Sequence, residues 1–60
     1  MYIKVVSKIY DLFTIENFNR LFEIDDYIGY EGTLYRVTSR TYIYQNDCWI
    51  IEVEEAKFRS

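Results

Sequence analysis

The chain has 60 residues, half of them hydrophobic and a fifth aromatic, and its ten acids and seven bases give a formal net charge of −3. A chain this short makes a single domain, residues 1–60, and buries only about 60% of its unfolded surface, so its stability is marginal. The acidic balance disfavours non-specific binding to nucleic acid, because basic patches supply most of that affinity.

The first predicted element is a strand over residues 2–9, in which apolar and charged side chains alternate. Ile3 and Val5 point to one face, whereas Lys4 and Lys8 lie on the other. The two lysines suit a solvated face or a sheet edge.

The second predicted element is a short helix over residues 15–23. Its apolar residues fall at helical spacing, and Thr14 is placed to cap the N-terminus. A helix of about two to three turns is not stable alone, so we expect it to pack on the sheet. Asp25-Asp26 is then expected to form the turn into the next strand. The apolar stripe consists of Ile15, Phe18, Leu21 and Phe22.

Three more strands are predicted over residues 27–31, 34–44 and 48–57, which are rich in Tyr, Val, Ile, Thr and Trp. Turns are expected at Glu31-Gly32, where glycine adopts positive φ easily, and at Gln45-Asn46-Asp47. The pattern is typical of a twisted antiparallel meander.

One register of the last hairpin is favoured by its cross-strand pairs. It pairs Ile43 with Trp49, Thr41 with Ile51, and Arg40 with Glu52. The reverse assignment of faces would expose the tryptophan and bury the arginine. One face then carries Val37, Ile43, Trp49, Ile51 and Val53, and the other carries Arg36, Thr38, Arg40, Tyr42, Tyr44, Cys48, Ile50, Glu52 and Glu54.

The predicted fold is mainly β with one helix: a small four-stranded antiparallel barrel or roll whose short helix lies between strands 1 and 2. An open four-stranded sheet with the helix on one face is the alternative. The predicted core consists of Ile3, Val5, Ile15, Phe18, Leu21, Phe22, Ile28, Val37, Ile43, Trp49, Ile51 and Val53.

The stretch DDYIGYEGTLYRVTSRTYIYQNDCWIIEV, residues 25–53, resembles small SH3-like barrel proteins. Those proteins often have an acid before a strand, a tight glycine turn, a strand similar to YRV and a long bent hairpin. The pattern is also similar to short, uncharacterised open reading frames of phages and prophages in low-GC bacteria. The resemblance covers about half of the chain and implies the barrel fold, but no site residue or peptide-binding activity.

Cys48 has no partner for an internal disulfide, and the chain has no histidine. The usual zinc sites are therefore not indicated, and no cofactor or metal is expected. The N-terminus has no apolar segment of signal-peptide length, and no run approaches the roughly 18 apolar residues that span a membrane. We expect a cytoplasmic protein, in the host cytoplasm if a phage encodes it.

The candidate partner-binding surface is the outer face of the last hairpin. Tyrosine and arginine are enriched at interface hot spots, although tyrosines are also simply favoured in strands. The same rings could stack on unpaired bases, but two glutamates on that face would repel phosphate. The candidate residues are Arg36, Arg40, Tyr42, Tyr44 and Ile50.

Catalysis is not expected from this sequence. Glu52 and Glu54 share a strand face about 7 Å apart by strand geometry, but a chain this small offers no cleft to tune a general acid. Cys48 has no histidine to activate it, and there is no glycine-rich phosphate loop. The acids could mimic DNA phosphates, but turn formation and solubility explain them better at this modest net charge.

The leading functional hypothesis is a non-enzymatic interaction protein of a phage or mobile element that binds or inhibits a host or viral protein. Abundant residues with AT-rich codons, such as Ile, Tyr, Phe, Asn and Lys, favour a low-GC genome. The alternatives are a homo-oligomeric structural or assembly component of a virion and a single-stranded nucleic-acid-binding module.

Overall fold

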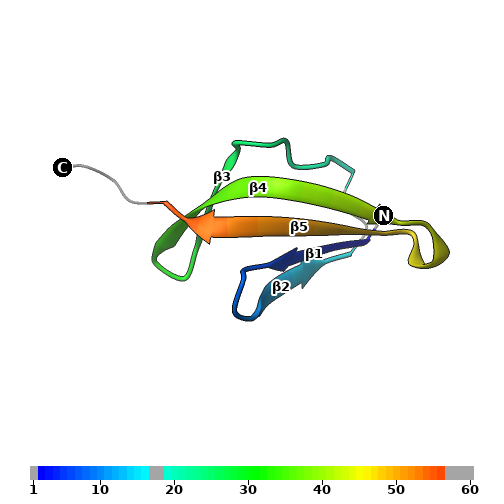
Figure 1. Ribbon diagram of the computed structural model, residues 1–60, viewed down its shortest axis with the longest axis horizontal. Coiled ribbons are helices and arrows are strands. Elements are labelled where there is room, and N and C mark those ends of the chain that lie inside the picture. Colours follow the sequence, from blue (N-terminus) through cyan, green and yellow to red (C-terminus); the bar gives the residue numbers. More distant parts are fainter. Residues whose placement is uncertain (1, 17–18, 57–60) are drawn as a thin grey trace.

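The computed structural model describes residues 2–16 and 19–56, and it folds them into one mixed sheet of five strands (Figure 1). No α-helix occurs in these ranges, and the predicted four-stranded antiparallel fold with a helix is therefore wrong. The strand order across the sheet is β2-β1-β5-β4-β3. The elements are β1 (Tyr2–Val6), β2 (Asp11–Ile15), β3 (Tyr27–Tyr30), β4 (Thr33–Ile43), a 3-10 turn η1 (Tyr44–Asn46) and β5 (Cys48–Glu55).

Strand β1 lies inside the sheet, between β2 and β5, rather than at an edge. It pairs with β2 in antiparallel orientation and with β5 in parallel orientation, which places Ile3 beside Trp49 and Val5 beside Ile51. The sequence pattern gave no sign of this parallel pair, because alternation predicts a strand but not its neighbours. β1 also ends earlier than predicted, since Ser7 closes a turn by accepting hydrogen bonds from the following backbone.

The helix predicted over residues 15–23 is absent from the part of that range that the structure describes, 15–16 and 19–23. Ile15 is the last residue of β2, and residues 19–26, which we name the crossing segment, belong to no helix or strand. Thr14 is a strand residue rather than a helix cap. Three residues of the predicted apolar stripe still pack against the core, where they are partly buried: Ile15, Leu21 and Phe22. Phe18, the fourth member of the stripe, lies outside the described residues. β-branched and aromatic residues lower helix propensity, and pairing with β1 satisfies the backbone of residues 11–15 instead.

The register of the β4–β5 hairpin differs from the predicted one because of a bulge at Thr38. Val37 pairs with Val53, but Ser39 pairs with Glu52, so one residue of β4 has no partner on β5. The threonine hydroxyl donates a hydrogen bond to the Glu52 carbonyl across the gap, at 3.1 Å. An extra residue on one strand reverses the side-chain alternation beyond it.

Beyond the bulge, the residues of β4 that follow Thr38 therefore lie on the opposite faces from those that the sequence predicted. Tyr42 pairs with Trp49, and Ile43 pairs with Cys48. Directly opposite residues share a face of the sheet, so the tyrosine lies on the same face as the tryptophan. Ile43, predicted to be in the core, lies on the opposite, outer face instead.

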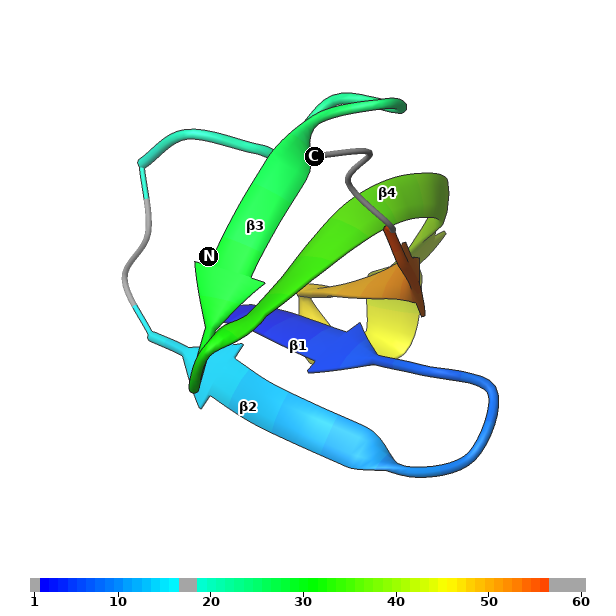
Figure 2. The ribbon, with the colours of Figure 1, turned by 90° about the vertical axis from the view of Figure 1, so that its left-hand side faces the viewer.

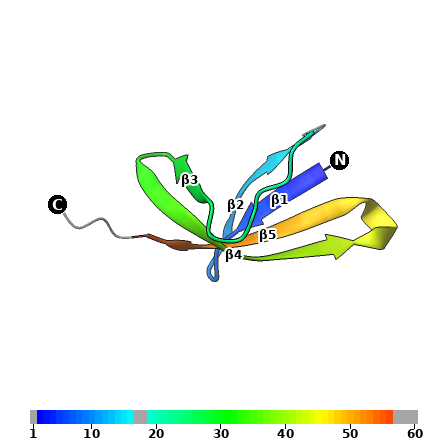
Figure 3. The ribbon, with the colours of Figure 1, turned by 90° about the horizontal axis from the view of Figure 1, so that it is seen from above.

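The sheet curls into a half-barrel whose inner face holds the core, as Figures 2 and 3 show. Phe13 of the edge strand β2 and Tyr30 of the other edge strand β3 approach with ring centroids 4.6 Å apart, so side chains bridge the open side. Tyr35, which is 7% exposed, is a core residue that the sequence analysis missed. The core consists of Ile3, Val5, Ile28, Tyr35, Val37, Ile51 and Val53, and all but Tyr35 were predicted.

The segment between β2 and β3 is fixed against β4 by backbone hydrogen bonds. Val37 donates to the carbonyl of Asp26 and accepts from the N–H of Asp25, each at 2.9 Å. The Asp26 carboxylate also accepts a hydrogen bond from the N–H of Glu23, so the expected turn at the two aspartates is confirmed. These bonds hold Leu21 and Phe22 over the core without a helix.

The expected tight turn at Glu31-Gly32 is confirmed. Both residues have positive φ, 48° and 80°, which is the conformation of a type I′ hairpin turn. The strands on either side, β3 and β4, start and end within a residue of the predicted bounds.

We expect removal of one methylene group at Ile51 to lower the free energy of unfolding by about 1 kcal/mol, because this side chain is fully buried at the β1–β5 pairing. The variant is Ile51→Val, measured by urea unfolding. The matched control is Ile9→Val at a side chain that is 85% exposed, which should change stability by less than about 0.5 kcal/mol. Equal effects of the two variants would contradict the assigned core.

Candidate functional site

Arg36, the first of the candidate binding residues, lies between two acids. Its guanidinium donates to the carboxylates of Asp25 and Glu54. Bonding to Glu54, and then to Asp25, raises the pKa of the arginine above its usual value. The side chain therefore ties the crossing segment to β4 and β5, and its charge is compensated within the protein.

Arg40 lies on the other side of the sheet from the position predicted for it. Its guanidinium is 6.0 Å from the centroid of the Trp49 ring, a cation–π distance. It also donates to the Phe22 carbonyl at 3.1 Å and lies 3.6 Å from the Glu23 carboxylate. The residue thus holds the crossing segment against the hairpin. With both candidate arginines paired to acids, the positive stripe that a nucleic-acid site needs is not formed by them.

Tyr42 packs against the core side of the hairpin. Its ring centroid lies 5.1 Å from that of Trp49, with a tilt of 44°. Its hydroxyl donates a hydrogen bond of 2.7 Å to the carboxylate of Asp47. This bond, together with burial, raises the pKa of the tyrosine above its usual value. Tyr42 therefore braces the turn between β4 and β5.

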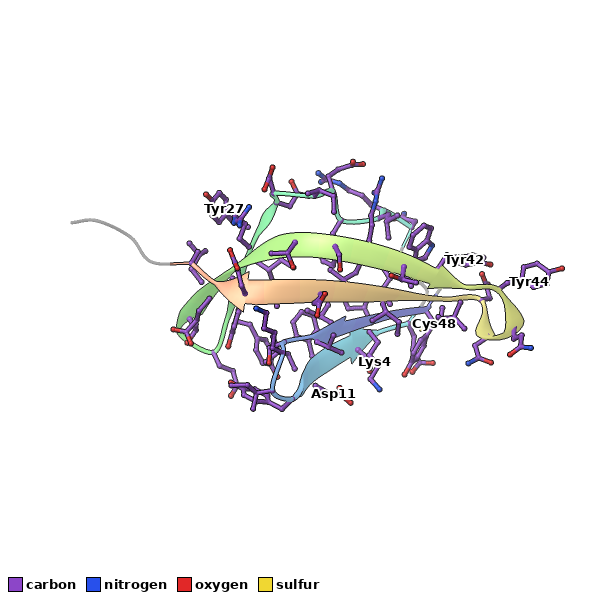
Figure 4. The ribbon with its side chains drawn as sticks, in the orientation of Figure 1. Lys4, Asp11, Tyr27, Tyr42, Tyr44 and Cys48 are labelled. Carbon is purple, nitrogen blue, oxygen red and sulfur yellow. The ribbon has the colours of Figure 1, made fainter. Side chains whose placement is uncertain are left out.

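Tyr44 lies at the far end of the hairpin and is 85% exposed (Figure 4). It begins the 3-10 turn η1, and the adjoining Asp47 adopts left-handed backbone geometry with φ 48°. The hairpin extends beyond β1 and β2, so this ring is presented at one end of the long axis of the molecule.

Ile50 lies on the outer face of the sheet, beside a hollow of about 430 Å³. The register explains this grouping, because Ile50 is paired with Lys4 of β1 and Cys48 is paired with both Tyr2 and Ile43. Residues paired across adjacent strands share a face. The hollow is lined by Tyr2, Lys4, Ile43, Asn46, Cys48 and Ile50.

Lys4 supplies the charge at the margin of this hollow. Its ammonium lies 3.0 Å from the carboxylate of Asp11, and bonding to that acid raises the pKa of the lysine above its usual value (Figure 4). The hollow is therefore mostly apolar and locally neutral. We use the name tip surface for Tyr2, Ile43, Asn46 and Ile50, together with Tyr44, which follows Ile43 in the chain and is exposed at the hairpin end.

The five candidates thus do not share one face. Arg36 lies on the outer face near β3, Arg40 and Tyr42 lie beside Trp49, and only Tyr44 and Ile50 belong to the tip surface. Sequence reasoning missed Tyr2 and Ile43 as surface residues. Alternation along the first strand places Tyr2 on the same face as Lys4 and so indicates that Tyr2 is exposed. The exposure of Ile43 depends on the bulge, which the sequence pattern does not indicate.

The acids and the thiol are held in structural contacts. Glu52 accepts a hydrogen bond of 3.0 Å from the Ser39 hydroxyl, and Glu54 pairs with Arg36. Cys48 is buried, and its thiol contacts the backbone carbonyl of Trp49. Within residues 2–16 and 19–56, no group of three or more potential ligating side chains is placed to hold a metal ion.

No protein-family model, no curated protein and no solved structure matches this chain. In the described ranges, no helix is long and apolar enough to cross a membrane.

We expect stability to fall as pH rises through the pKa of Tyr42. The folded state raises this pKa, so the stabilising contribution is present below the unfolded value of about 10 and is lost at higher pH. Asp47→Asn removes the charge that holds the proton, so the pKa of Tyr42 should move down toward its usual value. The ¹³Cζ chemical shift of Tyr42 measures this titration.

The control for this titration is Glu55→Gln, which removes a charge at the opposite end of β5. That variant should leave the Tyr42 titration unchanged. An unaltered Tyr42 titration in Asp47→Asn would contradict the assigned bond.

Proposed function

We propose that the chain is a non-enzymatic protein-interaction module that docks the tip surface onto another protein. The observation that carries the proposal is the gathering of Tyr2, Ile43 and Ile50 around an outer hollow, on the face opposite the core. The core already has its own apolar residues, so packing within the domain does not account for this second group. Aromatic and aliphatic anchors around a recess are typical of protein interfaces.

The position of Tyr44 supports the same proposal. A tyrosine loses little conformational entropy when it is immobilised, and this ring is fully available at the end of the hairpin. The end of the hairpin is held in place, because Tyr42 and Trp49 pack together beside the turn and Tyr42 bonds to Asp47 within it. A rigid projection with an aromatic end can enter a recess on a partner without reorganising the domain.

The chemistry of the partner follows from charge. The chain is acidic, with a formal net charge of −3, and the tip surface itself is uncharged apart from the neutralised Lys4 at its margin. A partner whose apolar recess is surrounded by basic residues would be attracted by the net negative charge of the chain, and its recess would then take up the uncharged tip surface. The composition favours a phage or mobile element of a low-GC bacterium as the source, acting on a host or viral protein in the host cytoplasm.

The proposal predicts that Tyr44→Ala and Ile50→Ala each weaken capture of a specific protein by at least about fivefold, equivalent to about 1 kcal/mol. The measurement is affinity capture from a low-GC bacterial lysate with the immobilised protein, quantified by mass spectrometry. The control is Ile9→Ala, which truncates a side chain in the β1–β2 turn that is as exposed as Tyr44.

A captured protein that is retained equally by the two tip variants and by the control would contradict the proposal. Circular dichroism of each variant checks that the fold is intact. Retention that is lost only in the tip variants would assign the surface.

A further inference from the structure

Strand β3 leaves one of its edges unpaired, and the register shows which backbone groups lie there. Tyr30 and Thr33 close the two-residue turn as a hydrogen-bonded pair, and Ile28 lies opposite Tyr35. Along an antiparallel ladder, residue pairs that exchange backbone hydrogen bonds alternate with pairs that do not. The hydrogen bond from the Val37 N–H to the Asp26 carbonyl fits this alternation. The N–H and C=O groups of Tyr27 and Gly29 therefore point away from β4, along the free edge.

The two edge strands of the sheet differ in how they are protected. At β2 the pairing with β1 is interrupted by a bulge, and Asp11 forms an ion pair with Lys4. Bulges and charges are devices that prevent an edge from pairing with another chain. Strand β3 has the sequence YIGY, with no charged residue, no proline and no bulge. The strand itself thus carries none of these protective devices.

The side chains along this edge complement one another. Tyr27 is 62% exposed, and it points away from the molecule at the end opposite Tyr44 (Figure 4). Two residues further along, Gly29 is exposed, and a β-carbon built there would meet no atom within 4 Å. A bare glycine on an edge strand is stabilised when an aromatic ring from the neighbouring strand covers it.

We propose that two copies of this chain associate by antiparallel pairing of their β3 strands, with Ile28 opposite Ile28 of the second copy on the twofold axis. This register places Tyr27 of each copy opposite Gly29 of the other. The free N–H and C=O groups of both residues are then satisfied reciprocally, by four backbone hydrogen bonds. The proposal is independent of the function assigned to the tip surface, which lies at the other end of the molecule.

The charges near the edge permit this arrangement. Arg36, the β4 neighbour of Tyr27, pairs with Asp25 and Glu54, so its positive charge is compensated within the protein. The β4 neighbour of Gly29 is the apolar Leu34, against which the incoming ring can pack. A short pairing between two acidic chains makes a weak dimer, so the relevant concentration range extends to the millimolar level.

The test uses the full chain in sedimentation equilibrium over micromolar to millimolar concentrations. Wild type should show a monomer–dimer equilibrium. Gly29→Val should lower the association constant by at least about tenfold, because the new side chain occupies the place of the incoming ring. Its backbone φ is not in the left-handed region, and the space around it is open, so the monomer accommodates valine. Tyr27→Lys should lower association to the same degree, because edge lysines oppose strand pairing.

Two controls introduce the same two residue types, valine and lysine, at positions away from β3. Thr41→Val places the same side chain on an exposed strand position away from β3, and Tyr44→Lys adds the same charge at the hairpin end. Both should leave the association constant within about twofold of wild type. In a mixture of labelled and unlabelled chains, a nuclear Overhauser effect should join the Tyr27 ring to the Gly29 α-protons of the other copy. A monomer at every concentration would overturn the proposal, and so would a dimer that neither β3 variant weakens.

Discussion

The parallel pairing of β1 with β5 is the contact on which the rest of the structure depends. It joins the beginning of the chain to the end of the hairpin, and it places Ile3 and Val5 beside the inward residues of β5, where both are fully buried. Without this pair, β3, β4 and β5 would form an open meander with one apolar face exposed to water. Its cost is the loop-closure entropy of residues far apart in sequence, which burial of the shared core offsets.

The bulge at Thr38 decides which residues this core leaves for the surface. It moves Tyr42 to the same side as Trp49, where the two rings pack together, and it moves Ile43 outward to the hollow beside Ile50. A single unpaired residue therefore converts the expected aromatic binding face into a structural brace. The apolar surface available to a partner lies instead at the end of the hairpin, on the outer face.

Prediction from the sequence succeeded where the signal was local. The turn at Glu31-Gly32, the strands on either side of it and six of the seven core residues follow from turn chemistry and alternation. The helix over residues 15–23 failed because the same apolar positions can reach the core through a strand and a crossing segment held by Val37. Of the candidate site, Ile50 lies on the outer face and Tyr44 is exposed at the end of the hairpin, whereas both arginines are bound by acids that the sequence does not place beside them.

The sequence by itself determined that the chain is rich in strands, where its tight turn lies and that the six aliphatic residues of the observed core are apolar and inward-facing, because these properties depend on neighbouring residues and on hydrophobicity. Only the tertiary structure decided the position of β1 between β2 and β5, the bulge at Thr38 and the ion pairs of Arg36 and Arg40. Each of these depends on contacts between distant segments, whose free energy no local pattern encodes. Since a shift of one residue reverses the faces of a strand, the location of the proposed binding surface follows from the register and not from composition.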